Sequence, residues 1–183
     1  MKIVVGVVVV IILSFGGFLL FGNTDNTAPD GGGSGTAQNA DSQDTIPNVR
    51  LNDESGNTVL MHDVALGKPA IINTWATWCP FCVDELPEFA ELQAAYRNDV
   101  RVIAVNRAES QARAEGYLSD LGVLGGMIYL YDGGDAWYRA IGGFSMPETL
   151  FVDAEGVIVL HKRGPLTFEE ADAIVRNQLI TEN

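Results

Sequence analysis

The sequence predicts an α/β domain with a mixed central sheet and helices on both faces, preceded by one transmembrane helix. Three observations carry this prediction. An uncharged apolar run covers residues 3–21, strand-like and helix-like segments alternate from residue 46 onward, and the alternation begins with a hairpin pattern. Strands that alternate with helices favour a sheet covered on both faces.

The apolar run is close to the ~20 residues that a helix needs to cross a bilayer. The alternative is a cleaved signal peptide, whose apolar core is usually roughly 7–15 residues long and ends at a small-x-small site. No convincing site of that kind follows Phe21. Lys2 is the only cation near either end of the run, and segments rich in Lys and Arg stay cytoplasmic. We therefore expect a single-pass anchor at residues 1–21, with its N-terminus in the cytoplasm and the rest of the chain in the periplasm or on the outer surface.

Residues 22–45 contain mainly Gly, Ser, Asn, Asp and Thr, so we expect a flexible acidic linker. Residues 46–183 are then long enough for one domain with a single core. The net charge of −13 argues against nucleic-acid binding, which requires a basic patch. We expect this domain to be a monomer.

The first half of the domain predicts a hairpin, a buried strand and a long helix. The hairpin is "NVRLNDESGNTVLMHDV", with its turn around "ESGN". The continuous apolar run "PAIINTW" is typical of a strand buried on both faces. The helix is "CPFCVDELPEFAELQAAYR", where Pro80 suits the first helical position and Pro87 should kink the middle.

The second half continues the alternation. We expect a strand at "VRVIAVN", a helix at "ESQARAEGYLSDLG", a strand at "MIYLY" and a short helix at "DAWYRAIG". Two strands, "ETLFVD" and "VIVLHK", follow around a turn at "AEG". The last helix should begin at Thr167, because Glu170 three residues later completes a capping box.

The only two cysteines, Cys79 and Cys82, lie where the first long strand meets its helix. In open α/β sheets this is the carboxyl end of a strand, where sites tend to lie. A thiol attacks as a thiolate, which a helix N-terminus stabilises. We expect Cys79, just before Pro80, to be the more exposed attacking thiol. Cys82, about one turn further on, could then attack the mixed disulfide and release the partner.

Two other interpretations of C-x-x-C compete with a redox pair. A zinc half-site needs two more ligands, but the only histidines, His62 and His161, are far apart and read as surface residues. A structural disulfide across so short a loop would remove little unfolded-state entropy. C-x-x-C beside a strand–helix–strand pattern favours redox chemistry, with no metal and no cofactor other than the disulfide.

The stretch "WATWCPFC" resembles the active-site motif of thioredoxin-fold proteins, which implies a thioredoxin-like three-layer α/β/α fold. More narrowly, "GKPAIINTWATWCPFCVDELPEF" is similar to the membrane-tethered TlpA/ResA group, whose extra N-terminal hairpin resembles the hairpin predicted above. Further on, "GGFSMPETLFVDAEGVI" resembles the segment with the fold's cis-proline, and its "PET" form is closest to the cytochrome c maturation thioredoxins of the CcmG/DsbE type. The resemblance covers nearly all of residues 46–179.

This resemblance implies roles for individual residues. Cys79 would be the nucleophile and Cys82 the resolving thiol. Pro147 would be the cis-proline that packs against the disulfide, and Met146 would offer its backbone to the partner's extended chain. A cis X-Pro bond is uncommon, so this expectation is specific.

Five further residues belong to the predicted site or its support. We expect Trp78 at the rim, with Pro80 and Phe81, to contact the partner protein. Asn73 falls where cytosolic thioredoxins usually carry a buried aspartate, and Asn is typical of the tethered group. Trp75 is expected in the core beside the site.

Glu85 matches the acidic residue that the tethered group places three positions after the second cysteine. Cys82 must lose a proton when it resolves a mixed disulfide, and a partly buried carboxylate nearby could take that proton. Such a position would also raise the pKa of Glu85 towards neutrality. The alternative is a first-turn glutamate that only complements the helix dipole.

The direction of electron flow is predicted from charge. The dipeptide "PF" between the cysteines brings no positive charge, and Asp84 and Glu85 lie close by, so the thiolate of Cys79 is weakly stabilised and the couple less oxidising. The resemblance implies the same direction: reduction of protein disulfides outside the membrane, including those of apocytochrome c, with electrons from a membrane thiol carrier. However, proline at the first position between the two cysteines, as Pro80 is here, also occurs in oxidising relatives. An oxidant or isomerase on the same fold therefore stays open, as does a non-redox binding module.

Overall fold

The computed structural model describes residues 44–180. The expected anchor at residues 1–21 and nearly all of the expected linker lie outside that range. Among the described residues, no helix is both long and apolar enough to cross a membrane.

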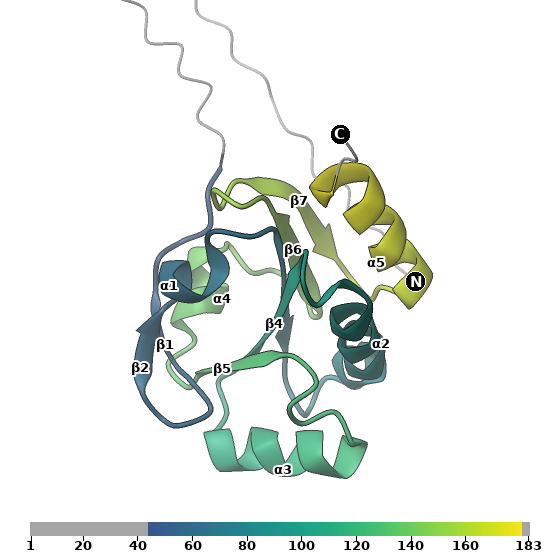
Figure 1. Ribbon diagram of the computed structural model, residues 1–183. Coiled ribbons are helices and arrows are strands. Elements are labelled where there is room, and N and C mark those ends of the chain that lie inside the picture. Colours follow the sequence, from purple (N-terminus) through teal and green to yellow (C-terminus); the bar gives the residue numbers. More distant parts are fainter. Residues whose placement is uncertain (1–43, 181–183) are drawn as a thin grey trace, which may run out of the picture. The chain divides into compact units, whose positions relative to one another are not determined.

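Seven strands form one mixed sheet in the order β2-β1-β5-β4-β3-β6-β7 (Figure 1). Strands β3, β4 and β5 are parallel to one another, and all other neighbours pair in the antiparallel sense. The bounds are β1 (Arg50–Asn52), β2 (Thr58–Leu60), β3 (Ala70–Trp75), β4 (Arg101–Arg107), β5 (Ile128–Asp132), β6 (Glu148–Val152) and β7 (Ile158–Arg163).

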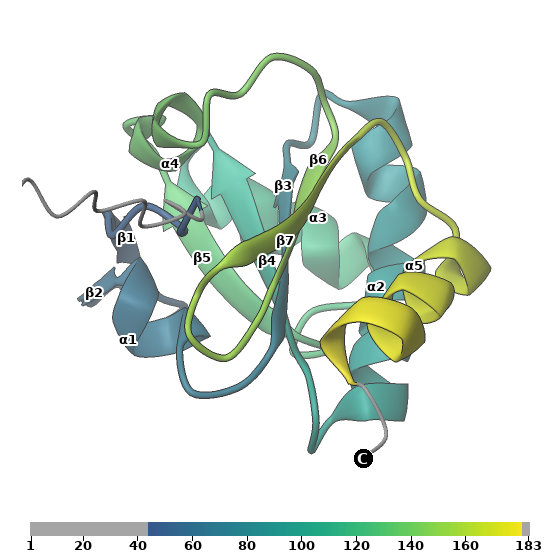
Figure 2. The same ribbon diagram turned by 90° about the horizontal axis from the view of Figure 1, so that it is seen from above.

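Helices cover both faces of this sheet, as the sequence predicts. The helices are α1 (Met61–Ala65), α2 (Pro80–Tyr96), α3 (Gln111–Leu121), α4 (Ala136–Ala140) and α5 (Phe168–Ile174), and a π-helical turn (Val175–Leu179) follows the last. Figures 1 and 2 show α2 and α5 on one face and α1 and α4 on the other. Two apolar clusters fill the layers: one joins α2, α3 and α5 to the sheet, and the other joins α1, α4 and the hairpin to it.

Strand β3 lies inside the sheet, between β4 and β6, and positions the site. All six of its residues are buried, which explains why apolar and polar residues do not alternate along it. Its carboxyl end leads through a short loop into α2, and the parallel neighbour β4 ends at the same edge. The loops after both strands therefore meet beside the start of α2.

The predicted hairpin is present, but its second arm is shorter than expected. Strands β1 and β2 pair in the antiparallel sense, with Arg50 opposite Leu60. The segment "MHDV", which the hairpin pattern included, begins helix α1 instead. The reason is tertiary, because Met61 N donates to Val49 O at 3.0 Å and the Met61 side chain is fully buried.

Specific hydrogen bonds tie both ends of the described range into the fold. Thr167 caps α5 through the predicted capping box, since its hydroxyl accepts from Glu170 N and the Glu170 carboxylate accepts from Thr167 N. At the other end, Asp44 O accepts a hydrogen bond from Ile158 N at 2.8 Å. The chain thus pairs with the sheet from a point two residues before the predicted boundary at residue 46.

Candidate functional site

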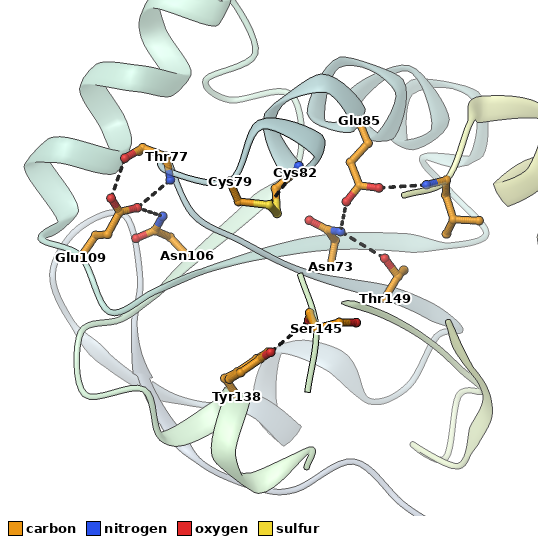
Figure 3. Close-up of a disulfide and its surroundings, with 11 residues drawn as sticks. Asn73, Thr77, Cys79, Cys82, Glu85, Asn106, Glu109, Tyr138, Ser145 and Thr149 are labelled. Carbon is orange, nitrogen blue, oxygen red and sulfur yellow. Dashed lines mark hydrogen bonds between the residues drawn. A yellow bond between two sulfur atoms is a disulfide. The ribbon is translucent and has the colours of Figure 1, made fainter. Parts of the chain in front are cut away.

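Cys79 and Cys82 form a disulfide at the start of α2, with their Cα atoms 5.3 Å apart (Figure 3). Cys79 is the N-cap residue and Pro80 is the first helical residue. The backbone N–H of Cys82 donates to Cys79 Sγ at 3.3 Å, so the helix terminus is placed to stabilise a thiolate there. The Cys79 side chain is 5% exposed and that of Cys82 is fully buried, which is the predicted order of access.

Glu85 lies one turn beyond Cys82 and is 2% exposed. Burial raises the pKa of its carboxyl to about 8, against the lowering effect of two hydrogen bonds. Leu166 N donates to Glu85 Oε2 at 3.0 Å, and Asn73 Nδ2 donates to Glu85 Oε1 at 2.6 Å. A carboxyl group with this pKa changes its proton occupancy close to neutral pH.

Asn73 lies in β3 and is completely buried. Its amide nitrogen donates both to Glu85 and to Thr149 Oγ1, the latter at 3.1 Å (Figure 3). Trp75, at the end of the same strand, is also fully buried and belongs to the apolar cluster that contains both cysteines. Both residues are buried beside the site, and their role in supporting it stays a prediction.

The Met146–Pro147 peptide bond is cis, as the resemblance implies. Pro147 is buried, and Met146 is half-buried against the cluster that contains the disulfide. The loop 142–146 thus reaches the site just before β6 begins at Glu148. Contact of Met146 with a partner chain stays a prediction.

Trp78 and Phe81 flank the cysteines in the chain, and Phe144 belongs to the loop 142–146; we call these three exposed aromatic residues the aromatic rim. Their exposed fractions are 54%, 62% and 85%, and they make up three of the five large exposed apolar side chains among the described residues. Pro80 is exposed as well. A patch of exposed apolar side chains is typical of a surface that binds another molecule, and we expect these three to contribute to one.

Glu109 supports the loop before Cys79 and was missed at the level of sequence. Its carboxylate accepts from Thr77 N at 2.8 Å, Thr77 Oγ1 at 2.5 Å and Asn106 Nδ2 at 2.9 Å (Figure 3). It also pairs with Arg113 Nε at 3.0 Å. Burial opposes the charge, but these hydrogen bonds and the cation outweigh it and lower the pKa of Glu109. A polar residue just after a buried parallel strand was the signal that could have identified it.

Glu148 holds the loop 142–146 through hydrogen bonds from the loop's backbone. It is fully buried, and its Oε1 accepts from Phe144 N at 2.6 Å and Ser145 N at 2.7 Å. Its Oε2 lies 2.6 Å from His161 Nε2. Although burial opposes ionisation, the backbone donors and His161 lower the pKa of Glu148.

The interpretation of the two histidines as surface residues was wrong. The His161 side chain is only 21% exposed and contacts the buried Glu148, because β7 pairs with β6 and brings the two together. His62 is also partly buried, with its Nε2 atom 2.9 Å from Ile46 O. Both rings complete hydrogen bonds inside the fold.

The chain matches the family model described as Redoxin over residues 41–178. It is 36% identical to the thiol:disulfide interchange protein DsbE of Vibrio cholerae over 118 residues, which cover 62% of this chain and 60% of that protein. It is 33% identical to the thioredoxin-like protein YneN of Bacillus subtilis over 131 residues, which cover 69% and 74% of the two chains. The crystal structure of StoA from B. subtilis has the same fold, with a TM-score of 0.61 at 20% identity over 72% of this chain and 98% of that one.

Coverage of the relatives is partial. The chain spans 60%, 54% and 51% of the length of DsbE proteins from V. cholerae, Tatumella citrea and Yersinia pestis. The similarity therefore applies to the matched part of each relative and not to its whole length.

Proposed function

We propose that this chain, which belongs to the Redoxin family, reduces protein disulfides outside the cytoplasm by thiol–disulfide exchange. The observation that carries the proposal is the Cys79–Cys82 disulfide at the N-terminus of α2, next to a buried carboxyl group. The names of the relatives, which include thiol:disulfide interchange proteins, support the same chemistry.

Exchange begins from the reduced protein. The Cys79 thiolate attacks one sulfur of the substrate disulfide, a mixed disulfide forms, and the other substrate sulfur leaves as a thiolate. The thiolate of Cys82 then attacks Cys79 Sγ, which forms the intramolecular disulfide and releases the second substrate thiol. The substrate gains two electrons and the Cys79–Cys82 pair loses them.

Glu85 is the candidate acceptor for the proton of Cys82. The resolving thiol is buried and must ionise before it attacks, and a carboxylate nearby is the group that can accept its proton. The pKa of about 8 makes Glu85 a stronger base than an exposed glutamate. The hydrogen bond from Asn73 keeps its carboxylate form accessible despite burial.

The charges around the disulfide favour a reducing couple. Arg107 is paired with Asp135, with its Nη2 atom 2.6 Å from Oδ2, and Arg113 is paired with Glu109. Each cation is therefore offset by a carboxylate, which leaves the Cys79 thiolate with the helix N-terminus as its main support. A thiolate with less stabilisation makes a less oxidising couple.

Residues 3–21 would tether the domain to the membrane, with the N-terminus inside and the domain outside. The apolar run and the preceding Lys2 support this placement. A membrane thiol carrier would then return electrons to the Cys79–Cys82 disulfide. Apocytochrome c is the substrate class that the resemblance of the "PET" segment to cytochrome c maturation thioredoxins implies.

A trapping experiment tests this function. The Cys82→Ala variant should retain partner proteins as mixed disulfides on Cys79, visible on non-reducing gels, because nothing resolves them. The Cys79→Ala variant serves as the control and should retain none. If the first variant also retains none, the protein acts as a non-redox binding module and the proposal is wrong.

A further inference from the structure

Arg107, the last residue of β4, lies over two aromatic side chains. Its Cζ atom is 3.6 Å from the centroid of the Tyr138 ring and 5.9 Å from the centroid of the Trp78 ring. A guanidinium over an aromatic face is attracted by the ring quadrupole, and its flat shape allows stacking. Trp78 directly precedes Cys79, so Arg107 supports one side of the site.

Asp135 fixes the orientation of this guanidinium. Arg107 Nε and Nη2 donate to the two carboxylate oxygens of Asp135 at 2.8 and 2.6 Å, and both side chains are largely buried. Such a two-point contact restricts the plane of the guanidinium as well as its position. Asp135 also has a φ of 58°, in the left-handed region that is uncommon for residues other than glycine.

Tyr138 carries the contact on to the loop 142–146. A Cβ atom added at Gly143 would overlap the Tyr138 ring carbons, so the Gly143 backbone lies directly against the ring. The Tyr138 hydroxyl donates to Ser145 O at 3.0 Å (Figure 3), and Gly143 N donates to Tyr138 O at 2.8 Å. The loop that leads into the cis peptide bond is therefore fixed to the ring that stacks on Arg107.

We propose that Arg107 is a positioning residue that holds Trp78 and the loop 142–146 in a fixed relation for docking a substrate chain. This inference rests on the proposed function, because these are the two segments that would contact the peptide around its disulfide. One planar group thus connects both segments through its contacts with Trp78 and with Tyr138. In this role Arg107 acts on docking, since its charge is already offset by Asp135 and contributes little to the redox couple.

The test compares a large and a small substrate. The reduced full-length protein reacts either with a peptide dimer joined by one disulfide or with dithiobis(nitrobenzoate), which is too small to need both segments. The main variant is Arg107→Met with Asp135→Asn, which removes both charges and leaves no unpaired buried carboxylate. Arg139→Met, at an exposed arginine of the same region, is the matched control.

We expect the rate constant for the peptide disulfide to fall about five- to tenfold in the double variant. The rate constant for the small disulfide and the reduction potential should stay unchanged. A variant that failed to fold would change both, so this pattern separates docking from folding. Tyr138→Phe keeps the ring and removes only the bond to Ser145 O, and should give a smaller loss of about threefold with the peptide alone.

Two results would overturn the inference. Rate constants for both substrates that fall together would show a general structural role, and unchanged rate constants for both would show no role. These results require a wild-type protein that reacts with the peptide disulfide. A wild-type protein that does not react would overturn the proposed function, and this inference with it.

Discussion

The carboxyl group of Glu85 and the amide of Asn73 form a buried hydrogen bond of 2.6 Å that joins α2 to β3 beside the disulfide. The bond stabilises the ionised carboxylate, whereas burial stabilises the protonated form. Burial prevails and the pKa rises to about 8. This balance places the proton affinity of Glu85 near that of a free thiol, as proton exchange with Cys82 requires.

Removal of the Glu85 carboxylate should slow resolution of the mixed disulfide. Glu85→Gln keeps the size of the side chain but cannot accept the proton of Cys82, so the second step should slow about ten- to hundredfold. Acid quenching, alkylation and mass spectrometry would follow the mixed disulfide over time. Asp84→Asn is the control, because Asp84 is exposed on the same helix. Equal resolution rates in the wild type and Glu85→Gln would rule out the proton-accepting role.

Glu85 should also make the stability of the oxidised protein depend on pH. Its folded-state pKa of about 8 exceeds the ordinary value of 4.5, so the folded state holds the proton more tightly than the unfolded state. Its stabilising contribution is complete below pH 4.5 and is lost as the pH rises towards about 8. The wild type should lose roughly 1.4 kcal/mol per pH unit in this window relative to Glu85→Gln.

Denaturant unfolding of both proteins across this pH window measures the difference directly. The comparison cancels the opposite contributions of Glu109 and Glu148, whose pKa values are lowered and which stabilise the fold above their ordinary pKa. A difference between the two proteins that does not vary with pH would show that Glu85 titrates as an ordinary glutamate.

The parts of the site that the sequence predicts are those that are local in the chain. Cys79, Pro80 and Cys82 lie within one helical turn, so their spacing already implies a thiol pair at a helix start. The cis-proline segment was identified by its resemblance to a family, because no periodicity distinguishes Pro147 from an ordinary proline.

The parts that were missed depend on contacts between distant segments. The carboxyl group of Glu85 receives its second hydrogen bond from Leu166, 81 residues further along the chain. Glu109 reaches Thr77 only because β3 and β4 are parallel neighbours. The contact of Arg107 with Tyr138 requires the β4–β5 pairing and the turn that follows it. The order of helices and strands along the chain does not by itself specify any of these contacts.

Glu109 should contribute to stability through the loop that it holds. Glu109→Gln presents an NH2 group where the carboxylate accepts hydrogen bonds, so at least one buried donor loses its partner. We expect the free energy of unfolding at neutral pH to fall by about 1–3 kcal/mol. Glu91→Gln, at an exposed position of α2, is the control. Equal stability of the two variants would contradict the supporting role of Glu109.

Phe144 should affect partner binding without affecting the fold. Its side chain is 85% exposed, so Phe144→Ser should change the free energy of unfolding by less than about 0.5 kcal/mol. The yield of mixed disulfides trapped by Cys82→Ala should fall when Phe144→Ser is added. An unchanged yield would show that Phe144 does not contribute to partner binding.

The reduction potential of the Cys79–Cys82 couple tests the proposed direction of exchange most directly. The full-length protein would be equilibrated in dithiol redox buffers, alkylated and weighed to give the reduced fraction. We predict a potential near or below that of thioredoxin, roughly −270 mV. A value approaching that of a strong periplasmic oxidant, roughly −120 mV, would show that the protein donates disulfides and would contradict the proposed reductase.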